Sequence, residues 1–283
     1  MDEATRRLRE LAQRVVEAAL ELGPLRGALL TGSAARGDAD FYSDLDLLLY
    51  VDELPPEPRL TELRDALGGT NPVRFGERTP TFDALQFDLD GVAVQVCYAT
   101  VDGAETRLAA LLAGDEEVFG PSQKILAGVR EGVALHGRDL IELWQADVRA
   151  YPEALRRAMV SRHWRFFPLW YHADALPARD AELWRIDMLL EATFNLLGVL
   201  AGVNRIYFAR FELKRLRKLV GQMQIAPRDL ADRLEELFRL PPGEAAAALG
   251  RLVLEVQAIV RSELPGVDVD LKHPPGTRQR PWA

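Results

Sequence analysis

Apolar positions in the first fifty residues change from a helical to a strand-like spacing. They recur every three or four residues from Asp2 to about Leu22 and stop at Gly23-Pro24, which predicts an amphipathic opening helix. Two short apolar runs, 28–30 and 44–51, predict strands. The residues between them, 31–38, are small and flexible, so we expect a turn with a short helix at this point.

The next fifty residues predict one helix and one hairpin. Helical spacing covers 59–67, and a loop is expected around 68–70. The strand-like runs 84–89 and 92–98 are joined by Asp90-Gly91, which is a favoured hairpin turn. The N-terminal part is therefore expected to be an α/β (α+β) domain with a mixed sheet.

Beyond residue 100 the apolar spacing is helical almost throughout. Helices are predicted over 107–113, 124–135, 139–160, 181–203, 213–223, 227–238 and 244–262. We place a domain boundary near 136–138, because Gly137 follows one periodic segment and Asp139 is suited to cap the next. The predicted domains are an α/β domain over 1–136, an all-helical bundle over 137–270 and a loosely held basic, proline-rich tail over 271–283.

Composition and charge exclude several classes of protein. The chain has 283 residues, 48% of them hydrophobic and 28% charged, which fits a folded protein with a large core. A single cysteine, Cys97, and an N-terminus without an apolar signal segment lead us to expect a cytoplasmic protein. The most apolar stretch, 189–203, contains Glu191 and Asn195, so we expect no membrane span. A formal net charge of −8 disfavours a long nucleic acid as partner.

A glycine-serine pair and two aspartates form the segment that carries chemistry. Gly32 and Ser33 follow a predicted strand and begin the predicted short helix, where unpaired backbone N–H groups favour a phosphate. Asp44 and Asp46 stand at alternate positions of the next strand, so their carboxylates share a face, with Cα atoms about 6.5 Å apart. Asp-x-Asp alone is common, but in a strand this apolar the two acids indicate a counter-ion. Ligands that are all oxygen favour Mg²⁺ or Mn²⁺.

Residues 32–38 followed by Ser43-Asp44-Leu45-Asp46-Leu47 resemble the signature of the polymerase beta-type nucleotidyltransferase superfamily, with a spacing similar to its minimal and aminoglycoside branches. The resemblance implies transfer of a nucleoside monophosphate from a Mg-bound nucleoside triphosphate to a hydroxyl acceptor, either a small molecule or a protein side chain, with release of pyrophosphate. It implies that Gly32, Ser33 and Arg36 contact the nucleotide and that Asp44 and Asp46 hold the metal.

The third carboxylate that the superfamily places on a neighbouring strand falls at Gln95 in this sequence. An amide oxygen can ligate a metal, but it carries no charge and cannot accept a proton at neutral pH. Asp88 and Asp90 would replace it if the strand register were different, and otherwise they are solvent-facing acids of a hairpin. A catalytically impaired nucleotide-binding regulator, similar to an antitoxin, is therefore the alternative function, and a nucleic-acid polymerase is a poor third.

The predicted helices add a candidate acid. Glu191 lies four residues after Asp187, and both interrupt an apolar stripe. In aminoglycoside-type relatives an acid of the helical domain can serve as general base, so the resemblance makes Glu191 the candidate here and Asp187 its substitute. A structural ion pair with Arg185 or Arg205 is the alternative.

Three further residues are nucleotide candidates through the same resemblance. Asn204, Tyr207 and Lys214 are similar to a pattern that faces the nucleotide in bacterial relatives, although the basic run around Lys214 equally fits a solvated helix face. Arg157 and His163 have a spacing seen in a helical ribonuclease family, but such a pair arises easily by chance. The sequence leaves open the acceptor, the nucleobase and the oligomeric state, including a homodimer.

Overall fold

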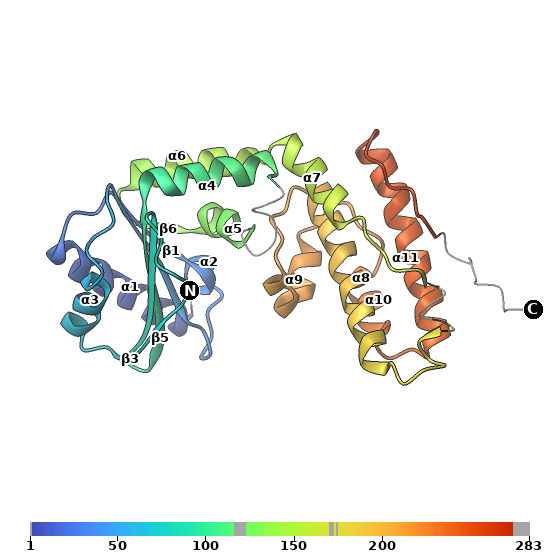
Figure 1. The fold of residues 1–283 in the computed structure, drawn as a ribbon, viewed down its shortest axis with the longest axis horizontal. Coiled ribbons are helices and arrows are strands. Elements are labelled where there is room, and N and C mark those ends of the chain that lie inside the picture. The colour runs from blue at the N-terminus through green and yellow to red at the C-terminus, as the bar shows by residue number, and fades with distance from the viewer. Residues whose placement is uncertain (1, 116–122, 170–172, 174, 274–283) are drawn as a thin grey trace, which may run out of the picture. The chain divides into compact units, whose positions relative to one another are not determined.

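The computed structural model describes residues 2–115, 123–169, 173 and 175–273 (Figure 1). The chain divides into two compact units, Met1–Val118 with Lys124–Tyr151, and Phe119–Gln123 with Pro152–Ala283. The domain boundary predicted at residue 136 is therefore too early. Most of the predicted tail, residues 274–283, lies outside the described residues.

The boundary moves because the predicted helix 139–160 is two helices. α6 (Arg138–Ala150) ends where Tyr151 adopts a positive φ of 41°, and α7 (Glu153–His163) begins after Pro152. A proline restricts the residue before it and has no N–H for a helical hydrogen bond. α6 therefore belongs to the first unit and α7 to the second.

The first unit is built on a six-stranded mixed sheet with the order β3-β4-β5-β2-β1-β6. The strands are β1 (Gly27–Thr31), β2 (Leu45–Val51), β3 (Thr70–Arg74), β4 (Phe82–Leu89), β5 (Val92–Thr100) and β6 (Val133–His136). β2 and β5 run parallel, whereas the other neighbouring strands are antiparallel. This arrangement confirms the predicted α+β class with a mixed sheet.

Helices cover both faces of the sheet. α1 (Glu3–Leu22) and α3 (Arg59–Leu67) pack on one face, and Figure 1 shows both on the same side of the strands. α1 begins as predicted, with the Asp2 carboxylate accepting the Thr5 N–H at 2.7 Å. On the opposite face α6 places Trp144 edge-on to Tyr50 of β2. α4 (Val101–Ala113) follows β5, and α5 (Gln123–Glu131) precedes β6.

Two edge strands were not predicted from the sequence. The five residues of β3 are all exposed and include Pro72, so no apolar alternation marks it, although proline is tolerated at a sheet edge. β6 falls in the predicted helix 124–135, which ends early at Gly132. A Cβ at Gly132 would lie 2.5 Å from the Leu29 side chain, so glycine lets the chain turn closely onto β1.

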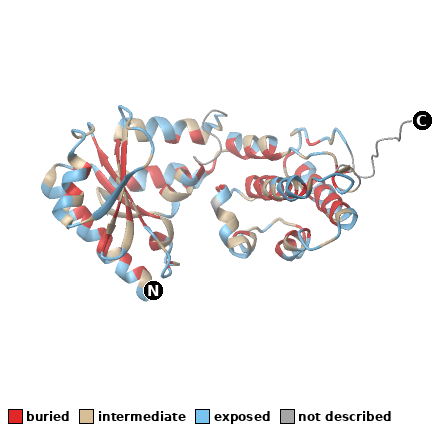
Figure 2. Ribbon diagram, turned by 60° about the horizontal axis from the view of Figure 1, so that its bottom comes forward, coloured by how far each residue is buried: buried red, intermediate tan, exposed pale blue. Residues whose placement is uncertain are grey.

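The second unit is all helical, as predicted. Its elements are α7, α8 (Glu182–Val203), the 3-10 helix η3 (Arg210–Arg215), α9 (Leu216–Gly221), α10 (Leu230–Glu236) and α11 (Pro242–Glu263). Among the described residues α8 is the one helix long and apolar enough to cross a membrane, but 67% of its apolar window is buried inside the protein (Figure 2). A core helix passes the same length and composition test.

His163 is a core residue of the second unit. Its side chain is 7% exposed, and its Nδ1 lies 3.2 Å from Asn195 Oδ1. The ring fills the space beside Gly198, where a Cβ would lie 2.4 Å from it. Burial lowers the pKa of His163 to about 4, so the ring is neutral at pH 7. These contacts give a structural reason for the histidine in the ribonuclease-like spacing with Arg157.

The buried neutral imidazole predicts that the protein loses stability as the pH falls from about 6.5 towards 4. In this window the unfolded chain protonates His163 and the folded chain does not, so the free energy of unfolding falls by up to about 1.4 kcal/mol per pH unit. Urea unfolding of the wild type and of His163→Gln across the window measures it, and the variant should lack this part of the slope. Equal slopes would show that His163 does not titrate as stated.

Candidate functional site

β1, α2 (Gly32–Arg36) and β2 bring a glycine turn against a carboxylate. α2 begins where β1 ends, and the sheet register pairs Thr31 with Asp46. Gly32 has a φ of +70°, and a Cβ on it would lie 2.5 Å from Asp46 Oδ2. A side chain at residue 32 would collide with that carboxylate, so this approach requires glycine. The turn and the acid therefore meet in space, as the motif predicts.

Asp44 immediately precedes β2, which begins at Leu45, so the prediction that both acids lie within the strand is wrong by one residue. Asp44 is exposed, whereas Asp46 is half-buried. The Nε2 amide of Gln95 donates a hydrogen bond to Asp44 Oδ2 at 3.3 Å. Gln95 is also the register partner of Asp46 on the parallel strand β5. One β5 side chain therefore stands next to both aspartates.

Gln95 occupies the place where the resemblance expects a third carboxylate. It pairs with Asp46 on one side and with Gln86 of β4 on the other, so these three side chains form one row on one face of the sheet. Within the described ranges, no three His, Cys, Asp or Glu side chains come together as a metal-binding group. The row supplies one carboxylate and two amides.

Neither acid of the hairpin takes the third position. Asp88 accepts a hydrogen bond from Asn71 Nδ2 at 2.8 Å. Asp90 lies in the turn with a φ of 52° and forms an ion pair with Arg14 at 2.6 Å. In the observed pairing of β2 with β5, Gln95 is the residue opposite Asp46.

Arg9 of α1 holds the α2 turn, a role that the sequence reasoning missed. Its Nε donates to the Ala34 carbonyl at 2.9 Å, and a terminal nitrogen donates to the Ala35 carbonyl at 2.7 Å. The turn closes where the N–H of Gly37 donates to the Ser33 carbonyl at 3.0 Å. On an amphipathic helix one such arginine looks like any surface arginine, so the sequence carried no signal for it.

Burial and three nearby charges act on Cys97 of β5. Burial is the main cause that raises the pKa of this thiol to about 12; Asp46 and Asp83 also raise it, and Lys124 of α5 lowers it. The thiol therefore stays protonated at neutral pH and is not a nucleophile. Lys124, which the sequence analysis left without a role, brings a positive charge to this side of the sheet. A Cβ at Gly128, one helical turn later on α5, would lie 3.4 Å from the Thr31 side chain at the end of β1.

Residues 12–96 match the family model of the nucleotidyltransferase domain. The matched residues all lie in the first unit, so the similarity to a nucleotidyltransferase domain is confined to this part of the chain. The matched residues include the glycine-serine turn, both aspartates and Gln95. No curated protein matches the chain.

Several solved structures are distantly similar. A nucleotidyltransferase-like protein from Exiguobacterium sibiricum 255-15 is 14% identical, with 90% of this chain and 77% of that chain covered and a TM-score of 0.45. A cytoplasmic RNA terminal U-transferase is 15% identical, with 89% and 66% covered and a TM-score of 0.31. The Cid1 poly(U) polymerase with MgGTP bound is 15% identical, with 89% and 69% covered and a TM-score of 0.32.

The matched residues also include Arg36, which was predicted to contact the nucleotide. Its guanidinium lies 3.4 Å from Asp38 and 3.8 Å from Glu131 of α5. These acids keep the guanidinium at the C-terminal end of the α2 turn. Its contact with a nucleotide stays a prediction.

Two residues predicted for the nucleotide serve the structure of the second unit. The side-chain amide of Asn204 donates to the carbonyls of Leu200 and Ile225 at 2.7 and 2.8 Å, and its oxygen accepts the Ile225 N–H at 2.9 Å. Asn204 thus ends α8 and ties it to the segment at Ile225, and its contact with a nucleotide stays a prediction. Tyr207 is 4% exposed, so its ring has no open face on which a base could stack.

The remaining candidates of the second unit lie on exposed or half-buried surface. Glu191 and Asp187 are both exposed on α8. Arg185, one of the two arginines considered as a structural partner, pairs instead with Glu182 at 2.6 Å. Lys214 lies in η3. The roles of Glu191 as base and of Lys214 as nucleotide ligand stay predictions.

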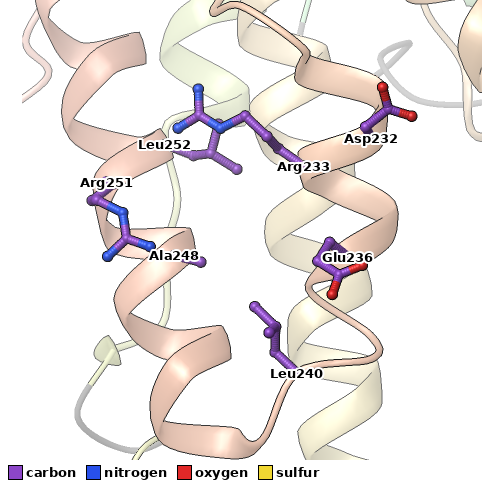
Figure 3. A pocket seen from close by; sticks show the side chains of 7 residues that line it. All are labelled: Asp232, Arg233, Glu236, Leu240, Ala248, Arg251 and Leu252. Carbon is purple, nitrogen blue, oxygen red and sulfur yellow. The ribbon is translucent and has the colours of Figure 1, made fainter.

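A cavity of about 390 Å³ lies in the second unit, outside the residues that match the family model (Figure 3). It is lined by residues of α10, α11 and the segment between them: Asp232, Arg233, Glu236, Leu240, Ala248, Arg251 and Leu252. Arg233 is bound through two nitrogens to Glu255, at 2.6 and 2.8 Å. None of the lining residues belongs to the site at Gly32 and Asp46.

Gly32→Ala tests the close approach, and Gly37→Ala is its matched control. Both alanines must adopt a positive φ, which costs about 1–2 kcal/mol. Only at residue 32 does the new Cβ meet another group, because nothing lies within 4 Å of a Cβ at Gly37. Thermal unfolding and calorimetric titration with Mg-ATP should show a larger loss of stability and a loss of binding for Gly32→Ala alone. Equal effects of the two substitutions would contradict the proposed geometry.

Proposed function

We propose that this chain binds a nucleoside triphosphate with Mg²⁺ or Mn²⁺ and transfers its nucleoside monophosphate to a hydroxyl acceptor, releasing pyrophosphate. The observation that carries the proposal is the approach of Gly32 to the Asp46 carboxylate within a matched nucleotidyltransferase domain. We propose a small molecule or a protein side chain as acceptor, because a net charge of −8 disfavours a long nucleic acid. The proposed setting is the cytoplasm.

The residues at the site fit a divalent metal ion. Asp44 and Asp46 offer carboxylate oxygens, and the side-chain amide of Gln95 stands beside both. Mg²⁺ commonly takes one or two carboxylates and completes its shell with substrate phosphates and water. Asp46 Oδ2 can approach the backbone at residue 32 this closely because Gly32 has no Cβ. When bound, the metal supplies positive charge to the phosphates at the reacting centre.

The chain's own residues supply the remaining functions. Backbone N–H groups at Gly32 and Ser33 donate to phosphate oxygens. Arg9 keeps that turn in place through its two carbonyl contacts. The acceptor oxygen attacks the α-phosphorus in line, the bond to the bridging oxygen breaks and pyrophosphate leaves. The acceptor's proton needs a base, and we assign that task to Glu191.

A nucleotide-binding regulator, similar to an antitoxin, is the second candidate, and Gln95 is the observation that favours it. With an amide at this place the domain lacks one anionic group that could hold a metal or take a proton. Pyrophosphate release with a panel of hydroxyl acceptors separates the two functions. Acceptor-dependent release eliminates the regulator, whereas nucleotide binding without release under any acceptor eliminates the enzyme.

Asp44→Asn and Asp46→Asn test the metal-dependent binding. Each substitution removes a charged oxygen ligand, so the affinity for Mg-ATP should fall by more than about tenfold in isothermal titration calorimetry. Asp90→Asn is the matched control because Asp90 is an exposed acid of the same unit, paired with Arg14. It should leave the affinity unchanged. Equal binding by all four proteins, or no binding by the wild type, would rule out the proposed function.

A further inference from the structure

We propose that the neutral side chain of Gln95 limits this site to one divalent ion per bound nucleotide, and that Gln95 positions Asp44 to hold it. The inference rests on the proposed function, because it concerns the ion that accompanies the nucleotide. The inference depends on residue 95 having a neutral amide in place of a carboxylate.

The sheet register places Gln95 where a further ligand would have to stand. Asp46 and Gln95 are paired residues of neighbouring strands, which run about 4.8 Å apart, and their side chains project from the same face. The next residue of this row, Gln86, is again an amide. Towards β1 the row continues with Thr31. A metal beside Asp46 therefore meets neutral groups in both directions along the row.

The charge at the site matches one divalent ion. Asp44 and Asp46 together carry two negative charges, which balance a single Mg²⁺ or Mn²⁺. Two ions held about 3.5–4 Å apart repel each other strongly, and beyond the substrate phosphates they need additional anionic protein ligands to stay together. Within the part of the chain that the structure describes, no cluster of three acidic, histidine or cysteine side chains offers them.

The acids nearest in sequence to this row have other partners. The Asp88 carboxylate binds Asn71, and Asp90 pairs with Arg14. Asp83, the remaining acid of β4, is buried and forms ion pairs with two arginines, Arg74 at 2.7 Å and Arg78 at 2.5 Å. Supplying a further anionic ligand would require breaking one of these contacts.

Gln95 also contributes something that a carboxylate could not. Asp44 precedes β2 and is exposed, so no strand pairing fixes its side chain. The Nε2 amide of Gln95 donates to its Oδ2 at 3.3 Å and turns the carboxylate towards β5. A carboxylate at residue 95 would repel Asp44 in the absence of metal. The amide therefore orders the two-acid site before any ion is present.

The stoichiometry of Mn²⁺ is the direct test. The full chain is titrated with Mn²⁺ at saturating α,β-methylene-ATP. Electron paramagnetic resonance measures the free Mn²⁺, and the bound Mn²⁺ is the total minus this free amount. The wild type should bind one Mn²⁺ per nucleotide and Gln95→Glu should bind two, so that over the same range of Mn²⁺ concentration only the variant shows a second equivalent of bound ion. Gln86→Glu, which puts the same charge one strand further from Asp46, should remain at one.

The outcomes separate failure of the proposed function from failure of this inference. No Mn²⁺-dependent nucleotide binding by the wild type overturns the proposed function. Two ions in the wild type overturn this inference and leave that function standing. One ion in a folded Gln95→Glu, with native circular dichroism, also overturns the inference, and the wild-type count decides even if that variant does not fold.

A double-mutant cycle tests the positioning role. If Gln95 acts through Asp44, Gln95→Leu should weaken Mn²⁺ binding in the wild type and have no further effect in an Asp44→Asn background. Additive losses of affinity would show that Gln95 does not act through Asp44.

Discussion

The contact between the backbone at Gly32 and the carboxylate of Asp46 constrains the rest of the first unit. It requires β1 to end beside the start of β2, the chain to turn with a positive φ and residue 32 to lack a side chain. Arg9 stabilises the turn from α1, which is itself anchored on the sheet by its apolar face. The proposed phosphate and metal sites are adjacent because Gly32 has no Cβ.

Local patterns predicted most of the first unit, and long-range pairing decided what they missed. α1, α3 and the β4–β5 hairpin carry their signals within a few residues, so their bounds were predictable. β3 and β6 are edge strands whose existence depends on partners far away in the sequence. The break at Pro152 did have a local signal, but proline is also tolerated in the first turn of a helix, so the apolar spacing outweighed it.

The candidate site followed the same division. Gly32, Ser33 and the two aspartates were found because their spacing is a sequence property. Arg9 and Lys124 were missed because a basic residue on a helix reveals nothing about what lies opposite. In the second unit, the half-buried Asn204 satisfies backbone groups at the C-terminal end of α8, a structural role that its sequence position did not reveal.

The amides beside Asp46 set the chemical character of the domain. A row with one carboxylate and two amides holds a metal less strongly than a row of acids, and it has fewer groups that could take a proton. These residues therefore support nucleotide binding better than rapid catalysis. A base that accepts the acceptor's proton must come from outside this row of side chains. Because the site can bind a nucleotide without catalysing its transfer, binding and catalysis need separate measurements.

A crystal structure of the chain with Mn²⁺ and a non-hydrolysable triphosphate would test the central claim most directly, because anomalous scattering locates the ion independently of any fitted ligand. The account predicts an anomalous peak against Asp44 and Asp46, with the β- and γ-phosphates on the backbone of Gly32 and Ser33. A nucleotide bound elsewhere, for example in the cavity between α10 and α11, with no ion at Asp46, would contradict it.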